Sequence, residues 1–215
     1  MRRIQNLMEQ WLFIGPDNRQ EQVNLPHTWN AKDGQDGGND YYRGICHYEK
    51  TFEKPEFDPE TEEVYLEFLG VNASSDVTVN GKELAHHDGG YSTFRINITE
   101  VLEDQNKLEV IVDNSVNGKV YPQKADFTFY GGIYRDVRFL IVSKEHFDLD
   151  YLGSNGIKIT PEVKENEANV HIETFTNTEE AQVNVQIKDQ DGKVVAEGNG
   201  CDVNPVSYTH LRAHE

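Results

Sequence analysis

The sequence has little positive charge, few cysteines and no long hydrophobic run. Its 215 residues include 20 Lys and Arg against 38 Asp and Glu, which gives a net charge of −18. This charge disfavours nucleic acid and anionic membranes as partners, because both are themselves negative. No apolar segment reaches the length of a membrane span, and no cationic start precedes a hydrophobic core. The sequence therefore predicts a cytoplasmic protein that binds neither nucleic acid nor membrane.

Several chemical motifs are also absent. Cys46 and Cys201 lie far apart without metal-ligand spacing, so we expect free thiols. The acidic, glycine-rich stretch 33–40 lacks the alternating oxygen ligands and terminal Glu of an EF-hand calcium loop, and is predicted to be a rim loop. No nucleophile elbow or phosphate loop occurs. We predict no metal, no cofactor and no catalytic residue in this chain.

The histidine pair His86-His87, followed by Asp88, invites a metal or acid–base interpretation. Neighbouring side chains on a strand point to opposite faces, so the two imidazoles could not share one ion there without a bulge. We prefer a loop, in which the glycines after Asp88 turn the chain so that Tyr91 and Phe94 enter the core.

Short runs of alternating apolar and polar residues are what the sequence has in abundance, with almost no helical period. This alternation is typical of antiparallel sheets. Asn80-Gly81 between two such runs predicts a type I′ hairpin, since both residues tolerate positive φ. Trp11 and Trp29 are predicted to lie in the core. The predicted fold class is all-β, with strands expected within 41–52, 64–72, 77–84, 94–98, 107–114 and 133–139.

The stretch 125–139 contains five aromatics, three of which lie with a Gly-Gly pair and Asp126 just before the last of these runs. Glycines at the start of a strand allow close backbone approach, so Asp126 could be held in a fixed loop. A carboxylate beside flat apolar rings suits a polyhydroxylated ligand, which offers hydroxyl donors and C–H faces. The alternative is an aspartate that caps its own turn beside core aromatics.

Four motifs resemble glycoside hydrolase family 2, which includes β-galactosidases, β-glucuronidases and β-mannosidases. They are Trp-Leu-Phe with Leu-Pro-His-Thr-Trp at 11–29, Tyr-Arg-Gly to Lys-Thr-Phe at 42–52, the block 70–94 with Val-Asn-Gly and Gly-Gly-Tyr, and Asp-Phe-Thr-Phe-Tyr-Gly-Gly-Ile-Tyr-Arg-Asp-Val at 126–137. The resemblance implies a jelly-roll sugar-binding domain first, an immunoglobulin-like domain second and a catalytic (β/α)8 barrel third. It implies that Asp126 contacts the sugar, and that Asn39 and Asp40 lie near the sugar pocket.

This resemblance divides the chain into a jelly-roll β-sandwich at 1–142 and an immunoglobulin-like β-sandwich at 143–205. The second region shows about four strands, with a hairpin at Asp191-Gly192, whereas an immunoglobulin-like sandwich needs about seven. It is therefore predicted to be truncated. Residues 206–215 are basic, rich in His and without alternation, and are interpreted as a non-native tail.

The predicted function is that of an N-terminal fragment of a family 2 glycosidase of β-galactosidase type. The implied partners are a carbohydrate with a non-reducing terminal β-linked sugar and the missing catalytic barrel. Because this family's two catalytic carboxylates project from barrel strands, the chain is not expected to be active alone. The alternatives are a free-standing carbohydrate-binding module and a purely structural β-sandwich.

Overall fold

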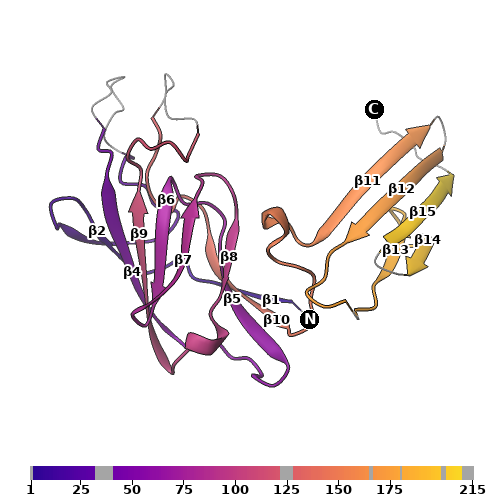
Figure 1. The fold of residues 1–215 in the computed structure, drawn as a ribbon, viewed down its shortest axis with the longest axis horizontal. Coiled ribbons are helices and arrows are strands. Elements are labelled where there is room, and N and C mark those ends of the chain that lie inside the picture. The colour runs from indigo at the N-terminus through magenta and orange to yellow at the C-terminus, as the bar shows by residue number, and fades with distance from the viewer. Residues whose placement is uncertain are drawn as a thin grey trace. The chain divides into compact units, whose positions relative to one another are not determined.

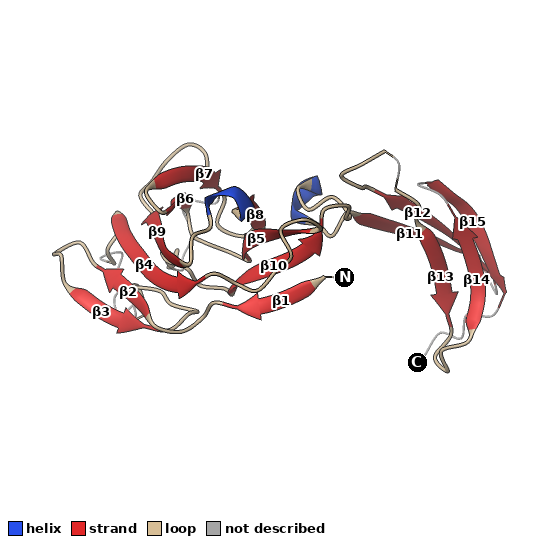
Figure 2. Ribbon diagram, turned by 90° about the horizontal axis from the view of Figure 1, so that it is seen from below, coloured by secondary structure: helices blue, strands red, loops and turns tan. Residues whose placement is uncertain are grey.

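A computed structural model describes residues 2–31, 41–121, 128–164, 167–179, 181–199 and 202–209. The chain divides into two compact units, Met1–Lys144 and Glu145–Glu215 (Figure 1). Within the described ranges the regular structure is strand apart from two short 3-10 turns, η1 (Thr99–Val101) and η2 (Tyr151–Gly153), which confirms the all-β prediction (Figure 2). No helix in this part of the chain is long and apolar enough to cross a bilayer.

Two antiparallel sheets form unit 1. One has six strands in the order β3-β2-β4-β9-β6-β7, and the other has four in the order β1-β10-β5-β8. Their bounds are β1 (Arg3–Asn6), β2 (Trp11–Ile14), β3 (Gln20–Val23), β4 (Ile45–Glu53), β5 (Glu62–Phe68), β6 (Ser74–Val79), β7 (Lys82–Asp88), β8 (Phe94–Asn97), β9 (Gln105–Asp113) and β10 (Val137–Ser143). This arrangement is a β-sandwich.

The core of unit 1 lies between the two sheets, because each strand turns one apolar row inward. Along β4, Cys46 and Tyr48 are fully buried while Ile45 is half exposed, as the alternation predicts. Trp11 is also fully buried and donates from Nε1 to the Leu7 carbonyl at 2.9 Å. Its prediction as a core residue is confirmed, whereas Trp29 packs against the core only partly buried.

Local turn chemistry agrees with the sequence at the β6–β7 connection. Asn80 and Gly81 have φ of 52° and 77°, the left-handed values that a type I′ turn needs. β7 extends from this turn through His86 to Asp88, so the predicted loop at these residues is wrong. Tyr91 is 53% exposed and does not enter the core, whereas Phe94 stacks on core residue Phe68 with ring centroids 4.9 Å apart.

The predicted strand at 133–139 begins later than the alternation suggests. Regular pairing starts only at Val137, where β10 joins β5. Before it, Gly132 forms an isolated bridge with Asn72, and Ile133 is fully buried. This part of the chain bonds to loop residues rather than to a neighbouring strand. The alternation of apolar and polar residues does not distinguish these two cases.

Unit 2 contains β11 (Ile157–Lys164), β12 (Glu167–Thr174), β13 (Asn184–Lys188), β14 (Val194–Asn199) and β15 (Asp202–Thr209). β11, β12 and β15 form one sheet, and β13 and β14 form a hairpin. Gly192 in that hairpin has φ of 80°, which confirms the predicted turn. β15 pairs with β12 as far as Thr209, so the strand runs into the stretch 206–215 that the sequence sets apart from the fold.

Candidate functional site

The three residues proposed from the sequence as sugar contacts are Asn39, Asp40 and Asp126. They lie outside the described residues, in the ranges 32–40 and 122–127. The chain on either side of both ranges is described, so the site can be built from the described residues that flank them. These flanking segments lie at the end of the six-stranded sheet where β4 begins and β9 ends.

Asn114, a buried side chain directly after β9, bonds to described residues that flank both ranges. Its Oδ1 accepts a hydrogen bond from the Gly44 backbone N–H at 2.8 Å. Its Nδ2 donates to Asn30 Oδ1 at 3.3 Å and to the Phe129 carbonyl at 3.4 Å. A buried amide is costly unless it is hydrogen-bonded. This one side chain therefore fixes three segments that are distant in sequence.

Asn30 anchors the same segments from the other side and is also fully buried. Its Oδ1 accepts from the Gly131 N–H at 2.7 Å, and its Nδ2 donates to the Tyr42 carbonyl at 2.9 Å. Trp29 Nε1 donates to that same carbonyl at 3.3 Å, and Thr28 Oγ1 donates to the Gly131 carbonyl at 2.8 Å. The residues that follow the first loop and those that follow the second are thus held side by side.

The Gly131-Gly132 pair is required for this close approach. A Cβ on Gly131 would lie 2.1 Å from Trp29 Cζ2, which is far inside van der Waals contact. Gly132 has φ of 131°, and a Cβ there would lie 2.5 Å from the His27 carbonyl oxygen. Both requirements agree with the sequence-based interpretation that the glycines allow close backbone approach.

A third amide, Asn72, lies between β5 and β6 and is nearly buried. It exchanges two backbone hydrogen bonds with Gly132, at 3.0 and 3.1 Å. Its Nδ2 also donates to the Tyr130 carbonyl at 2.8 Å. The segment that leaves the second loop is therefore fixed on both sides.

Aromatic side chains border the two loop openings. Tyr42 is 36% exposed and Tyr130 is 43% exposed, while Phe129 is buried under the Arg43 guanidinium, 5.9 Å from its ring centroid. The Tyr41 hydroxyl accepts from the Phe129 N–H at 3.4 Å and so joins the two loop ends directly. Partial burial raises the pKa of Tyr42, so its hydroxyl stays protonated at neutral pH.

The described part of the site holds no pair of carboxyl groups. Segments 28–31, 41–44 and 128–132 contain one charged side chain, Arg43, and no carboxylate. Hydrolysis by a retaining glycosidase needs two carboxyl groups about 5 Å apart. Exposed tyrosines and ordered backbone groups instead suit contact with a polar, flat-faced ligand such as a sugar.

The sequence did not identify Asn30, Asn72 and Asn114, which organise this end of the sheet. A signal was present for two of them, because Asn30 directly follows Trp29 and Asn72 directly follows Val71, whereas Asn114 follows Asp113. A polar amide at such a boundary is a candidate for a buried bond to a loop backbone. The partners of each amide could not be read from the sequence.

His86 and His87 lie in different surroundings, as expected of neighbours on a strand. His86 Nδ1 lies 2.6 Å from Asp76 Oδ1, and its Nε2 lies 3.1 Å from Asp88 Oδ1. Hydrogen bonds to Asp76 and then Asp88 raise the pKa of His86. The Ser74 hydroxyl is the main cause of the lowered pKa of Asp88, about 2. His87 instead stacks on Phe94 with centroids 4.1 Å apart, and burial lowers its pKa.

These contacts describe hydrogen-bonded surface side chains rather than a metal centre. Where the structure describes the chain, no group of three or more His, Cys, Asp or Glu side chains is placed to hold an ion. Cys46 is a buried free thiol, and burial raises its pKa to about 12.

Comparison with known proteins places this fold and these motifs in context. Residues 42–149 match the family described as "Glycosyl hydrolase 2 galactose-binding domain-like". A β-glucuronidase of Bacteroides fragilis is 41% identical over 145 residues, which cover 66% of this chain and 20% of that protein. The chain therefore spans about a fifth of the length of this relative.

Solved structures show the same architecture. The crystal structure of an FMN-binding β-glucuronidase from Facaelibacterium prausnitzii L2-6 matches 99% of this chain with a TM-score of 0.91 and 38% identity. A putative β-galactosidase from Bacteroides fragilis matches 96% with a TM-score of 0.83 and 30% identity. In each case the match covers 34% of the solved chain.

Proposed function

Because the chain belongs to glycoside hydrolase family 2, we propose that it is the N-terminal part of an enzyme that hydrolyses terminal β-glycosidic bonds. In this proposal unit 1, near 1–142, is the sugar-binding jelly roll, and 143–205 is part of an immunoglobulin-like domain. The chain's own contribution is a substrate-contacting loop that carries Asp126, with Asn39 and Asp40 beside it. The catalytic carboxylates would lie in a barrel that follows.

The observation that carries this proposal is the buried amide network at the loop end of unit 1. Asn30 and Asn114 use their whole side chains to fix the residues that leave both loops. A contact made by a loop is useful for catalysis only if the loop is held in place before the substrate arrives.

The relatives support a uronic acid as the terminal sugar in preference to galactose. The two relatives with the higher identity, 41% and 38%, are named as β-glucuronidases, and the match named as a putative β-galactosidase is 30% identical. We therefore propose a β-glucuronoside as the first substrate to test, which shifts the preference from the β-galactosidase type that the motifs suggested.

The test is Asp126→Ala in the full-length enzyme. A carboxylate that accepts hydrogen bonds from sugar hydroxyls in a desolvated pocket contributes about 1.5–3 kcal/mol for each bond. Its loss should lower kcat/KM by roughly ten- to a hundredfold and leave the melting temperature unchanged. The matched control is Asp104→Ala, an exposed aspartate next to the start of β9, at the other end of that strand.

Two outcomes would count against this role. A large fall in melting temperature with unchanged kinetics would show that Asp126 ties down its own loop. Equal effects of Asp126→Ala and Asp104→Ala on kcat/KM would show that the Asp126 loop makes no particular contact with substrate.

A further inference from the structure

The tetrapeptide Val-Asn-Gly-Lys occurs twice in unit 1, at 79–82 and at 116–119. The first copy forms the turn between β6 and β7, and the second follows β9 on the segment that leads to the range 122–127. An asparagine before a glycine can lose its side-chain amide, because no Cβ shields the backbone nitrogen that attacks it. Since the two copies have the same sequence, a large difference in this reaction between Asn80 and Asn117 would come from the fold.

The side chain of Asn80 is held by three hydrogen bonds. Its Nδ2 donates to the Val101 carbonyl and to Asn106 Oδ1, both at 2.9 Å. Its Oδ1 accepts from the Lys107 N–H, also at 2.9 Å. Both hydrogens of the amine that would leave are therefore bonded, and the amide cannot turn toward the next residue without breaking these bonds. The fold protects this copy.

The side chain of Asn117 is held in a different way, through its oxygen. Oδ1 accepts from the backbone N–H groups of Lys119 at 2.9 Å and Val120 at 3.0 Å, which forms an Asx turn. These two donors also stabilise the negative charge that develops on Oδ1 when a nucleophile adds to Cγ, as in an oxyanion hole. Among the described residues Nδ2 donates to the Ser115 carbonyl alone, at 3.4 Å, so the leaving amine is weakly held.

Gly118 supplies the attacking nitrogen in an open place. It is exposed, and apart from its chain neighbours no atom lies within 4 Å of the position that a Cβ would take. Another pair, Asn155-Gly156, differs in this respect. Gly156 is buried, and its N–H donates to Ser154 Oγ at 3.1 Å. The nitrogen of Gly156 is thus engaged, whereas that of Gly118 can approach its neighbour's side chain.

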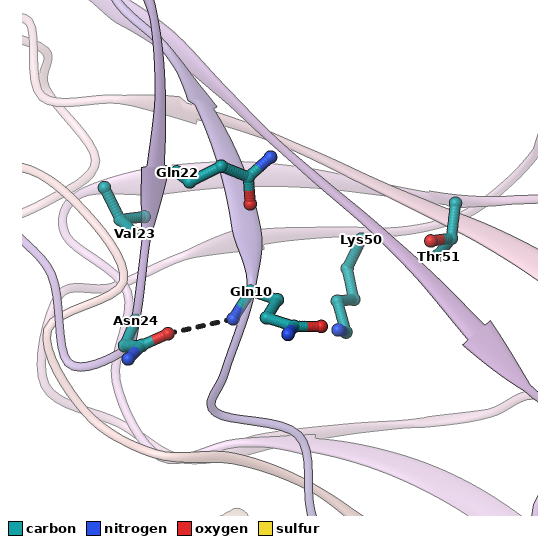
Figure 3. Close-up of a pocket in the computed structure, with 6 residues that line it drawn as sticks. All are labelled: Gln10, Gln22, Val23, Asn24, Lys50 and Thr51. Atoms are coloured by element: carbon teal, nitrogen blue, oxygen red, sulfur yellow. Dashed lines mark hydrogen bonds between the residues drawn. The ribbon is translucent and has the colours of Figure 1, made fainter.

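Asn24 shows that a bonded oxygen is not enough for this reaction. Its Oδ1 accepts from the Gln10 N–H at 2.9 Å, on the wall of the pocket drawn in Figure 3. The next residue is Leu25, which has a Cβ and donates its N–H to the Met8 carbonyl at 2.7 Å. Asn24 therefore lacks the unhindered nucleophile that Gly118 provides.

We propose that Asn117 is a modification site, at which the folded chain converts an asparagine to aspartate and isoaspartate. The Gly118 nitrogen gives up its proton and forms a bond to Asn117 Cγ. The Cγ–Nδ2 bond breaks, and Nδ2 takes up a proton and leaves as ammonia. Water then opens the resulting cyclic imide at either of its two carbonyl carbons. No oxidant or cofactor takes part, and the proposal does not rest on the proposed function.

The two products have different effects on the turn. Aspartate keeps an oxygen for the N–H groups of Lys119 and Val120, and adds one negative charge. Isoaspartate routes the backbone through Cγ, so that Oδ1 becomes a peptide oxygen and the Asx turn is lost. Val120, which is 6% exposed, then loses its packing, and Lys119 leaves its ion pair with Asp88 at 3.1 Å.

The experiment incubates the folded 215-residue chain at about pH 8 and about 37 °C for several weeks, and follows each asparagine by proteolysis and mass spectrometry. Each conversion adds about 1 Da to the peptide that carries it. We expect Asn117 to react at least about tenfold faster than Asn80 and Asn155, the controls in the same sample. In about 8 M urea, where the fold no longer distinguishes them, Asn117 and Asn80 should react at rates within about threefold.

Gly118→Ala tests the nucleophile. A methyl group fits at this position, so the chain should fold, and the loss of the Asn117 amide should slow by about tenfold or more. The matched control is Val116→Ala, at a neighbour that is 69% exposed, which should change the rate by less than about twofold.

Hydrogen exchange tests the effect on the turn. In the isoaspartate fraction, separated by chromatography, the Val120 amide should exchange at least about tenfold faster than in the unmodified chain. Asn117→Asp, which keeps the acceptor oxygen, should change this rate by less than about threefold. Unchanged exchange in the isoaspartate fraction would contradict the loss of the turn.

Four results would overturn the modification site itself. They are no mass increase at Asn117, equal rates at Asn117 and Asn80 in the folded chain, reaction of Asn155 before Asn117, and an undiminished rate in Gly118→Ala. The comparison in urea separates the two possible causes, because a preference for Asn117 that persisted there would come from the sequence rather than from the fold and would also contradict the proposal.

Discussion

The two units of this chain use the same kind of strand but bury it to different degrees. Unit 1 encloses a continuous core between two sheets, with Trp11, Tyr48 and Phe139 almost entirely removed from solvent. In unit 2 one strand, β11, leaves Ile157, Ile159 and Val163 between 40% and 61% exposed. Among the large apolar side chains described on β11–β14, Ile172 is buried, and the others are partly or largely exposed.

This difference shows that alternation alone does not make a stable sheet. A strand gains stability when its apolar row meets a second layer, at roughly 25 cal/mol for each Å² of apolar surface removed from water. Both units have alternating strands and well-formed turns. Among the described residues, most of the enclosed apolar side chains lie in unit 1, so the free energy of unfolding should be concentrated there.

The largest expected effect is that of Trp11→Ala. Loss of a fully buried indole and of its bond to the Leu7 carbonyl should destabilise unit 1 by about 3–5 kcal/mol. Chemical denaturation followed by fluorescence would measure this. The matched change in unit 2 is Ile159→Ala, at a residue that is 60% exposed, which should cost less than about 0.5 kcal/mol. Similar costs for the two substitutions would contradict the comparison.

Amide hydrogen exchange should separate the two units without any mutation. Two inner strands of unit 1, β6 and β9, are paired on both sides for most of their length, and should exchange at least about a hundredfold more slowly than β11 to β14. The physical reason is that unpaired edges and an exposed apolar row allow local opening. Strong and equal protection in both units would show that unit 2 is as stable as unit 1.

Asn114→Ala should have an intermediate effect, because it removes the acceptor of the Gly44 N–H and one donor each to Asn30 Oδ1 and to the Phe129 carbonyl. We expect a loss of about 1–3 kcal/mol in the stability of unit 1. Asn177→Ala is the matched change in unit 2. This exposed asparagine accepts from the His146 N–H at 2.9 Å, and its loss should cost less than about 0.5 kcal/mol, since water can replace it. Equal costs would mean that the amide network is solvated.

The smallest expected effect is that of His86→Gln, and it depends on pH. Because Asp76 and Asp88 raise the pKa of His86 in the folded chain, protonated His86 stabilises unit 1 below its unfolded pKa of about 6.5. This contribution is lost as the pH rises through the raised, folded value. Since His86 is nearly half exposed, we expect only a few tenths of a kcal/mol.

Thermal melts of both proteins at about pH 5.5 and about pH 8.5 would measure this contribution. The deficit of His86→Gln in melting temperature should be larger at the lower pH. A deficit of the same size at both values would show that a neutral hydrogen bond, rather than the charge, links His86 to the two carboxylates.

The sequence by itself determined the strands of the sandwich and its tightest turns. Alternation such as that of Cys46 and Tyr48 reports which face of a strand is buried, and Asn80-Gly81 needs no partner to form its turn. The resemblance of the motifs to family 2 glycoside hydrolases also came from the sequence alone. Asp126, Asn39 and Asp40 stay predictions, because they lie outside the described residues.

Only the tertiary structure decided which strand ends and loops meet. Asn30 bonds to Gly131 across 101 positions of the chain and accepts from Asn114 across 84, and no local pattern encodes such a pairing. The alternation of residues shows which face of each strand is buried. How far neighbouring strands pair, and which groups bond to the buried amides, depends on the packing of the whole domain.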